Sequence, residues 1–341
     1  MANSIQTGQY DMNDIFAIYE LAIPRSVRFW WYLILNICSL ICSLSVLYQL
    51  LFHRKLRQAL NNHVIIVLLF VGLIYESLSV PFMLHFYRVG YSWNITTSFG
   101  HFWQFMDYTS YTISLVGFAW ATIERHILIF HQQWIATRRQ RFFVHYLPIM
   151  AIVVYSIMYW FLLIFFPACE DRIFLQPMNG VPAPCMAYQL FWGKWNTVCH
   201  LILPTFIITI FSSALLFRIL WQKTRLNRSI QWRQNRKMTI QLVLISLLYL
   251  FFNLPRSILI SVTVDGRSLY LIIQLLMHLA FFAVQLIFFL PFICYMTIPG
   301  SGKRLKKLLL LKSGRNMIWP IGVTAGRENN NQTGQKETHM T

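Results

Sequence analysis

The stretch that decides the fold is FFVHYLPIMAIVVYSIMYWFLLIFFP, which covers residues 142–167. None of its residues is Asp, Glu, Lys or Arg. A helix of about 20 residues is long enough to cross the ~30 Å hydrocarbon core of a bilayer. A helix also satisfies its own backbone polar groups, which lipid does not do. The sequence therefore predicts that this stretch spans a membrane as a helix.

Six other runs along the chain share this length and apolar character. The seven runs cover residues 27–52, 63–86, 102–130, 142–167, 195–221, 238–264 and 269–298. The composition agrees, because 57% of the 341 residues are hydrophobic and only 12% are charged, which is unusual for a soluble domain. The predicted fold class is an all-α membrane protein, a bundle of seven transmembrane helices.

Most Lys and Arg residues lie on one side of the predicted bundle. The loops after the first, third, fifth and seventh runs, with the adjoining helix ends, hold 22 of the 29 basic residues. Because cytoplasmic loops carry an excess of Lys and Arg, these loops are predicted to be cytoplasmic. Seven crossings then place the N-terminus outside and the C-terminus in the cytoplasm of a multi-pass plasma-membrane protein. The net charge of +18 does not indicate nucleic-acid binding, since the basic residues alternate with apolar segments.

Two features agree with this topology. Asn94 begins the glycosylation sequon Asn94-Ile95-Thr96 in a loop assigned to the outside. Cys169 and Cys185 both fall in the second outside loop, where oxidation is possible. We predict that they form a disulfide, and the alternative is two free thiols.

The composition divides the chain into four parts. Residues 1–26 form a mostly polar, extracellular N-terminal segment, and residues 27–298 form the seven-helix domain. Residues 299–318 set leucines against lysines, which predicts an amphipathic juxtamembrane helix on anionic inner-leaflet lipid. Residues 319–341 are polar and are expected to be a disordered cytoplasmic tail.

The third run ends with Glu124-Arg125-His126, an acid and a base inside an apolar stretch. With seven runs and an outside N-terminus, this triplet resembles the acid-Arg-aromatic triplet of the rhodopsin-like (class A) G-protein-coupled receptors, and the likeness covers residues 27–311. The resemblance implies that Arg125 is held in the resting state and released toward a heterotrimeric G protein on activation. It also implies that the G protein docks near Arg236 and Lys237. The alternative is an interfacial Arg that reaches water beside a chance neighbour.

Prolines in three later runs add to the resemblance. Pro204, Pro255 and Pro291 match prolines of the family's fifth, sixth and seventh helices, which implies that they are hinges. A proline inside a helix frees a backbone carbonyl and introduces a kink, so a static bend is the alternative. The chain departs from the family where Gly72 replaces an Asp, Gly100 a Cys, Asn253 a Trp and Leu290 an Asn. We therefore expect a divergent receptor.

Asp107 is the candidate ligand-binding residue. It precedes Arg125 by 18 residues, which is five helical turns, so both lie on one face about 27 Å apart. An ionisable residue inside a membrane helix indicates a functional site. The resemblance implies that it pairs with a ligand amine, with aromatic rings around the cation from Trp103, Tyr108 and Tyr111. The alternative is a bond from Asp107 to another helix or to water, so the ligand is left as a small amine or a peptide.

The sequence contains no HExxH, GxSxG, P-loop or clustered His/Cys metal motif, so neither an enzyme nor a cofactor is expected. The competing class is a membrane transporter or ion channel that uses the intramembrane acids Asp107 and Glu76. The sequence favours a G-protein-coupled receptor that senses an extracellular ligand, because the basic loops and the triplet gather at the predicted cytoplasmic side.

Overall fold

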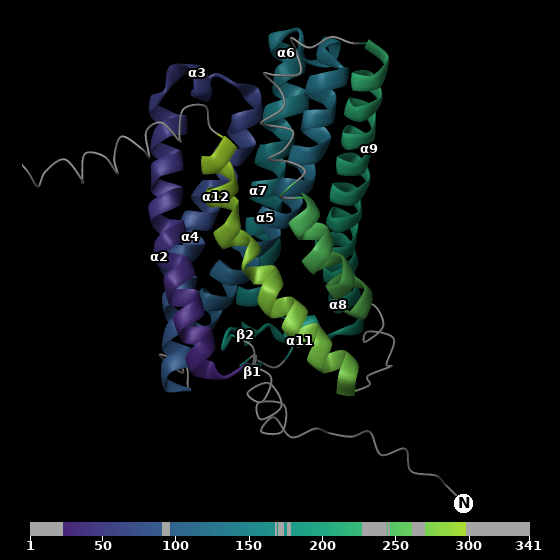
Figure 1. Ribbon diagram of the computed structural model, residues 1–341. Coiled ribbons are helices and arrows are strands. Elements are labelled where there is room, and N and C mark those ends of the chain that lie inside the picture. The colour runs from purple at the N-terminus through teal and green to yellow at the C-terminus, as the bar shows by residue number, and fades with distance from the viewer. Residues whose placement is uncertain are drawn as a thin grey trace, which may run out of the picture. The chain divides into compact units, whose positions relative to one another are not determined.

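The computed structural model describes residues 23–90, 96–167, 169, 174–175, 179–226, 244, 246–260 and 270–297. The chain divides into two units, Met1–Pro299 and Gly300–Thr341, and every feature described below belongs to the first. Long helices lie side by side in this unit, with α3 and α6 at one end and a short β-hairpin at the other (Figure 1). The two ends are called the α3 end and the hairpin end.

The elements follow one another along the chain in a simple order. The first half contains α2 (Arg25–Phe52), α3 (Arg54–Arg57), α4 (Leu60–Val89), α5 (Thr97–Phe130), the 3₁₀ turn η1 (Gln132–Ile135), α6 (Arg138–Arg141), the π-helical turn η2 (Phe142–Tyr146) and α7 (Leu147–Phe165). The second half contains β1 (Phe174–Leu175), β2 (Pro182–Ala183), the 3₁₀ turn η3 (Cys185–Tyr188), α8 (Leu190–Thr197), the π-helical turn η4 (Val198–Ile202), α9 (Leu203–Leu226), a helix over Ser246–Ile260, α11 (Tyr270–Val284) and α12 (Leu286–Thr297).

Five helical segments are long and apolar enough to cross a membrane. They are Arg25–Phe52, Asn62–Val89, Arg138–Phe165, Leu190–Leu215 and His278–Met296. The predicted fold class is confirmed at this level, as an all-α protein of the membrane type. The third predicted run corresponds to α5, and the sixth corresponds to the shorter apolar helix Ser246–Ile260.

Helix α2 has an apolar exposed face and several polar residues on its buried face. Its exposed side chains recur at helical spacing, at Ile34, Ile37, Ile41, Leu44 and Tyr48. Its buried side chains include Asn36, Ser39 and Ser43 on the opposite face. A water-soluble helix has the reverse arrangement, so this pattern fits a lipid-facing exterior.

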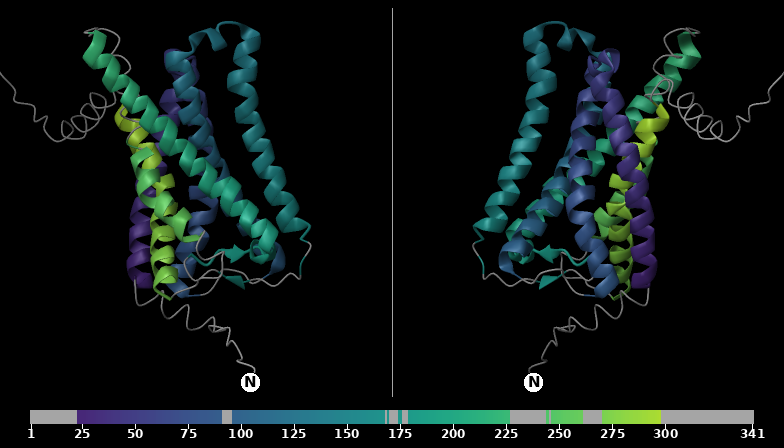
Figure 2. Two further views of the ribbon diagram at one scale, coloured as in Figure 1. Left: turned by 90° about the vertical axis from the view of Figure 1, so that its right-hand side faces the viewer. Right: turned by 90° about the vertical axis from the view of Figure 1, so that its left-hand side faces the viewer.

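Helix α5 is the centre of the bundle, because it packs against α4, α7 and α9. Figure 2 shows α9 inclined across the other long helices. The contact with the helix Ser246–Ile260 includes stacked rings of Phe118 and Tyr249, whose centroids lie 4.8 Å apart. A helix surrounded by other helices needs less apolar surface, and α5 accordingly buries polar side chains at Gln104, Thr109, Ser110, Thr112 and Ser114.

Of the predicted hinge prolines, Pro204 lies next to an irregular turn of its helix. Pro204 is the second residue of α9 and directly follows the π-helical turn η4. Pro148 has the same position after the π-helical turn η2. A proline lacks the N–H that an α-helix needs, and a π-turn is one way to accommodate the missing bond. Pro255 lies within the helix Ser246–Ile260, and Pro291 lies inside α12.

The break between α11 and α12 lies before Pro291, at Gln285. Its backbone carbonyl accepts hydrogen bonds from the N–H groups of Phe288 and Phe289. Its side-chain oxygen accepts from Trp31 Nε1 at 3.0 Å, which ties the break to α2. The break in the helix therefore lies about two turns before the proline.

The hairpin end is closed by a buried segment of the loop between α7 and α8. β1 and β2 pair antiparallel, with Phe174 opposite Ala183. Val181 is buried in a cluster that contains Phe86 and Trp103. The side chain of Asn179 accepts a hydrogen bond from the Val181 N–H at 3.1 Å, which holds the turn. The segment 179–183 therefore acts as a plug over this cluster.

Gly180 allows the plug to approach α4, and replacing it is expected to weaken the fold. Its φ of +74° is strained for other residues, and an added Cβ would overlap the ring of Phe86. Gly180→Ala is therefore expected to lower the free energy of unfolding by about 2 kcal/mol. Thermal unfolding of the detergent-purified protein measures this. Gly72→Ala is the matched control with an expected change near zero, because its Cβ would lie 3.6 Å from Ile287 Cγ2. Equal melting temperatures for the two variants would contradict the assignment.

Candidate functional site

Helix α5 presents two groups of polar residues, one toward each of its ends. Trp103, Asp107 and Tyr111 are spaced four residues apart toward the hairpin end, so they share one face. Glu124 and Arg125 lie near the other end of the helix. Each group continues onto α4, and the two groups are described in turn.

The first group is the Asp107 network, formed by Asp107, Ser79, Trp103 and Tyr75. The Ser79 hydroxyl donates to Asp107 Oδ1 at 3.2 Å, and Trp103 Nε1 donates to Ser79 Oγ at 3.0 Å. The Tyr75 hydroxyl lies between Asp107 and Met83 Sδ, 3.7 Å from the sulfur. Since a thioether is a weak acceptor, the carboxylate is the stronger partner of the two. Asp107 is therefore bonded to α4, as the alternative interpretation of this residue requires.

The aromatic residues predicted around Asp107 have different surroundings. Trp103 is completely buried and orients Ser79. The ring of Tyr108 packs against Trp160 of α7, with centroids 4.7 Å apart. Tyr111 contacts the helix Ser246–Ile260 through its hydroxyl, which donates to Asn253 Oδ1 at 3.0 Å. Tyr111 thus links Asp107's face of α5 to the helix Ser246–Ile260.

Arg256 joins the same hydroxyl from the other side. Its Nη1 donates to the Tyr111 hydroxyl at 2.6 Å, and its guanidinium carbon lies 5.3 Å from the centroid of that ring. Its charge also acts on the Asp107 carboxylate. Asn253 was noted from the sequence, because the resembled family usually has a tryptophan there. That Asn253 and Arg256 share the Tyr111 hydroxyl was not foreseen.

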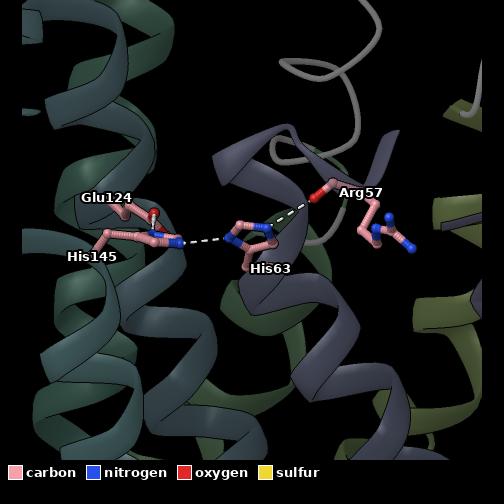
Figure 3. Close-up of polar contacts among 4 residues, drawn as sticks. All are labelled: Arg57, His63, Glu124 and His145. Atoms are coloured by element: carbon pink, nitrogen blue, oxygen red, sulfur yellow. Dashed lines mark hydrogen bonds and ion pairs between the residues drawn. The ribbon is translucent and has the colours of Figure 1, made fainter. Parts of the chain in front are cut away.

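The second group is the Glu124 network, formed by Glu124, His145 and His63 (Figure 3). Glu124 of α5 bonds to Nδ1 of His145 in η2. Nε2 of His145 lies 2.8 Å from Nδ1 of His63 in α4. Nε2 of His63 lies 2.9 Å from the backbone carbonyl oxygen of Arg57. Glu124 and His145 are both buried. One series of hydrogen bonds thus joins α5, η2 and α4 and ends at the Arg57 carbonyl oxygen.

These bonds fix the number of protons in the Glu124 network. The carbonyl of Arg57 can only accept, so His63 Nε2 donates to it. If Glu124 is ionised, His145 Nδ1 donates to it, and the bond between the two rings needs one more proton. One ring is then an imidazolium that balances the carboxylate. If Glu124 is protonated, both rings are neutral, so the network has no net charge in either form, as a buried site favours.

Arg125 is buried beside this network, and His126 is only half buried. Nε2 of His126 lies 3.4 Å from Nη1 of Arg218 on α9, a long contact. The Arg218 guanidinium also stacks on Phe130, 4.3 Å from the ring centroid. No partner for Glu124 was named from the sequence, and the structure gives it His145. The signal that could have found it is a histidine within an otherwise uncharged stretch.

Glu76 follows Tyr75 on α4 and is completely buried. The Ser39 hydroxyl of α2 bonds to Glu76 Oε1 at 2.7 Å and lies 3.1 Å from the carbonyl oxygen of Phe288 in α12. The other carboxylate oxygen, Oε2, has no hydrogen-bond partner among the residues that the structure describes. Glu76 therefore connects α2, α4 and α12 through one serine.

Cys169 and Cys185 form a disulfide near the hairpin end, which is the pairing predicted from the sequence. Several other predicted features lie outside the described residues. They are the glycosylation site Asn94, the docking residues Arg236 and Lys237, the amphipathic helix 299–318, the tail 319–341 and residues 1–22 of the N-terminal segment. Within the described ranges, no group of three or more His, Cys, Asp or Glu side chains could hold a metal ion.

Comparison with models of known protein families gives no match to this chain, and comparison with curated protein sequences gives none either. The functional interpretation consequently rests on the geometry of the Asp107 and Glu124 networks and on the sequence pattern.

Proposed function

We propose that the protein is a plasma-membrane receptor with seven transmembrane helices, an extracellular N-terminus and a cytoplasmic C-terminus. It binds an extracellular small amine or peptide near Asp107 and activates a heterotrimeric G protein through Arg125. In this proposal it is a divergent relative of the rhodopsin-like (class A) G-protein-coupled receptors, and Arg236, Lys237 and the anionic inner-leaflet lipid lie on its cytoplasmic side.

The arrangement of the helices supports seven crossings. Five apolar segments supply five of them, and α5 and the helix Ser246–Ile260 supply the other two. The greater polarity of α5 is consistent with a span, because this helix packs against other helices on several sides. The basic residues of α3 and α6 lie at the same end of the bundle, as cytoplasmic loops would (Figure 1).

One observation carries the proposal: α4 and α5 are joined by a polar network at each end of their contact. Asp107 of α5 bonds to Ser79 of α4 toward the hairpin end. Glu124 of α5 is connected through His145 to His63 of α4 toward the α3 end. A ligand that replaces the first set of bonds changes how the two helices fit together, and this change reaches the segment that contains Arg125. Binding shifts the equilibrium only as far as the ligand prefers the active arrangement.

Second-messenger recordings in cells that express the protein test this function, with panels of amines and peptides applied outside. Asp107→Asn is expected to raise the half-maximal ligand concentration about tenfold or more, since a hydrogen bond to a charged group contributes about 1.5–3 kcal/mol. Arg125→Ala is expected to remove the response while ligand binding persists. Ser98→Ala, an exposed position on α5, is the control and should respond like the wild type. A response that is unchanged in Arg125→Ala at equal surface expression would refute the coupling role.

A transporter or ion channel is the second candidate, and Glu76 favours it. An acid that is completely buried with one oxygen unpartnered among the described residues is a possible ion-binding group along a pathway. This function predicts a current or solute uptake that is lost in both Asp107→Asn and Glu76→Gln. A receptor predicts neither current nor uptake, so the same cells distinguish the two functions.

A further inference from the structure

We propose that the ligand is a small dipolar molecule, an amino acid or a close derivative, whose carboxylate binds Arg256 and Asn253 while its ammonium binds Asp107. This inference rests on the proposed function, because it takes Asp107 as the mark of the ligand site. It adds a second half to that site, on the helix Ser246–Ile260, and with it a requirement for a negative charge on the ligand.

Arg256 supplies the charge that this second half needs. Its guanidinium donates through Nη1 to the Tyr111 hydroxyl, and its Nε is buried with no hydrogen-bond partner among the described residues. Among the residues that the structure describes, no carboxylate forms an ion pair with Arg256. A guanidinium is always charged and presents its N–H groups in a planar fork that matches a carboxylate. The missing partner is therefore an anion of that shape.

Asn253 lies one turn before Arg256 and provides an independent indication of the same partner. It is completely buried, and its Oδ1 accepts a hydrogen bond from Tyr111. Its Nδ2 has no acceptor within the described ranges. Buried polar groups are nearly always paired in folded proteins. Since Nδ2 and Arg256 Nε are both donors on residues linked by one hydroxyl, a single acceptor group could satisfy both.

Asp107 does not fill this role, because it is already bonded to α4. Its carboxylate accepts from Ser79, and Tyr75 lies beside it. It lies one helical turn from Tyr111, and the charge of Arg256 acts on it without forming an ion pair. The site thus contains an acid and a base on different helices, each with its main bonds to other residues.

The balance of charge selects a dipolar ligand over a simple amine. With Asp107 ionised and Arg256 protonated, the pair is neutral overall. A cation at Asp107 would be repelled by the nearby guanidinium, and the repulsion is strong where water is scarce. A ligand that brings an ammonium to Asp107 and a carboxylate to Arg256 is itself neutral and leaves no charge unpaired.

Binding measurements on the purified full-length protein test the proposal without depending on a G protein. The probes are the 20 standard L-amino acids, each compared with its decarboxylated amine and its N-acetyl form, and the readout is the shift in melting temperature in detergent. At least one amino acid is expected to stabilise the wild type, with about tenfold weaker binding of both matched analogues. If no amino acid binds, or if an amine binds as tightly as its parent amino acid, the proposal is wrong.

Three variants assign the two halves of the site. Arg256→Gln is expected to weaken amino-acid binding about tenfold and to leave amine binding unchanged or stronger. Asp107→Asn is expected to weaken the binding of both, and Asn253→Leu that of the amino acid alone. Arg256→Lys keeps the charge and controls for folding, with melting temperature and surface expression measured for each variant. Equal loss of amine and amino-acid binding in Arg256→Gln would overturn the assignment. In the wild type, an amine that binds as tightly as its parent amino acid would overturn it independently.

The proposed function and this inference can fail separately. If amino acids bind but no second messenger responds, the dipolar site stands and the receptor function does not. If an amine or a peptide without a free carboxylate elicits a G-protein response that is unaffected in Arg256→Gln, the receptor function stands and this inference is refuted.

Discussion

Replacement of His145 by leucine is expected to destabilise the protein by about 3–5 kcal/mol, because it leaves Glu124 buried without its partner. His145 is completely buried and bonds to Glu124 through Nδ1 and to His63 through Nε2. Its loss therefore leaves both Glu124 and His63 Nδ1 without this partner. Denaturant or thermal unfolding of the detergent-purified protein measures the change, and the melting temperature should fall by several degrees.

Two matched variants show whether this effect comes from the network. His126→Leu replaces a half-buried histidine of α5 whose contact with Arg218 is 3.4 Å long, and we expect a loss below about 1 kcal/mol. The double variant Glu124→Leu with His145→Leu removes both partners, and we expect it to be more stable than His145→Leu alone. If His145→Leu and His126→Leu unfold at the same temperature, Glu124 does not depend on His145.

The helices were predictable from the sequence because a membrane span needs only length and apolar character. Residues 142–167 satisfy both, and the structure places α7 within them. The start was placed too late, since the helical segment begins at Arg138, where Thr137 and Gln140 form a reciprocal capping box. Hydropathy does not register such a cap, because the residues that make it are polar.

The break at Gln285 was not predictable in the same way. The hinge at Pro291 stays a prediction, and a proline restricts only the turn before it, so it carries no information about a break near residue 285. The side chain of Gln285 is buried and bonds to Trp31 of α2, which is far away in the sequence. Contacts of this kind depend on which helices meet, and periodicity carries no information about that choice.

The same limit applies to the candidate site, because its charged residues could be found from the sequence but their contacts could not. Asp107, Glu124 and Arg125 were found because charges are rare in apolar runs. The partners of Asp107 and Glu124 were missed, since Ser79 and His145 are ordinary residues until α4 and η2 are placed against α5. Asn253 differs from the resembled pattern, and the structure gives it a position next to Tyr111 and Arg256. One departure from the family pattern, Asn253, thus lies at the proposed site.

Removal of the disulfide between Cys169 and Cys185 is expected to cost about 3 kcal/mol, because a cross-link over a loop of this length restricts the unfolded chain. The two cysteines are 16 residues apart in the sequence, and the loop that they close contains the buried plug 179–183. The variant with serine at both positions should therefore melt at a lower temperature than the wild type. Reduction of the wild type with dithiothreitol should produce the same shift.

Cys38→Ser provides the control for this experiment, because Cys38 is a free, exposed cysteine of α2. This variant should melt like the wild type and should remain sensitive to dithiothreitol, whereas the double serine variant should be insensitive. Mass spectrometry after alkylation verifies that the disulfide has been reduced. If the reduced wild type keeps its melting temperature, the plug is held by the packing of Val181 against Phe86 and Trp103 rather than by the cross-link. Gly180→Ala would then lower the melting temperature more than loss of the disulfide does.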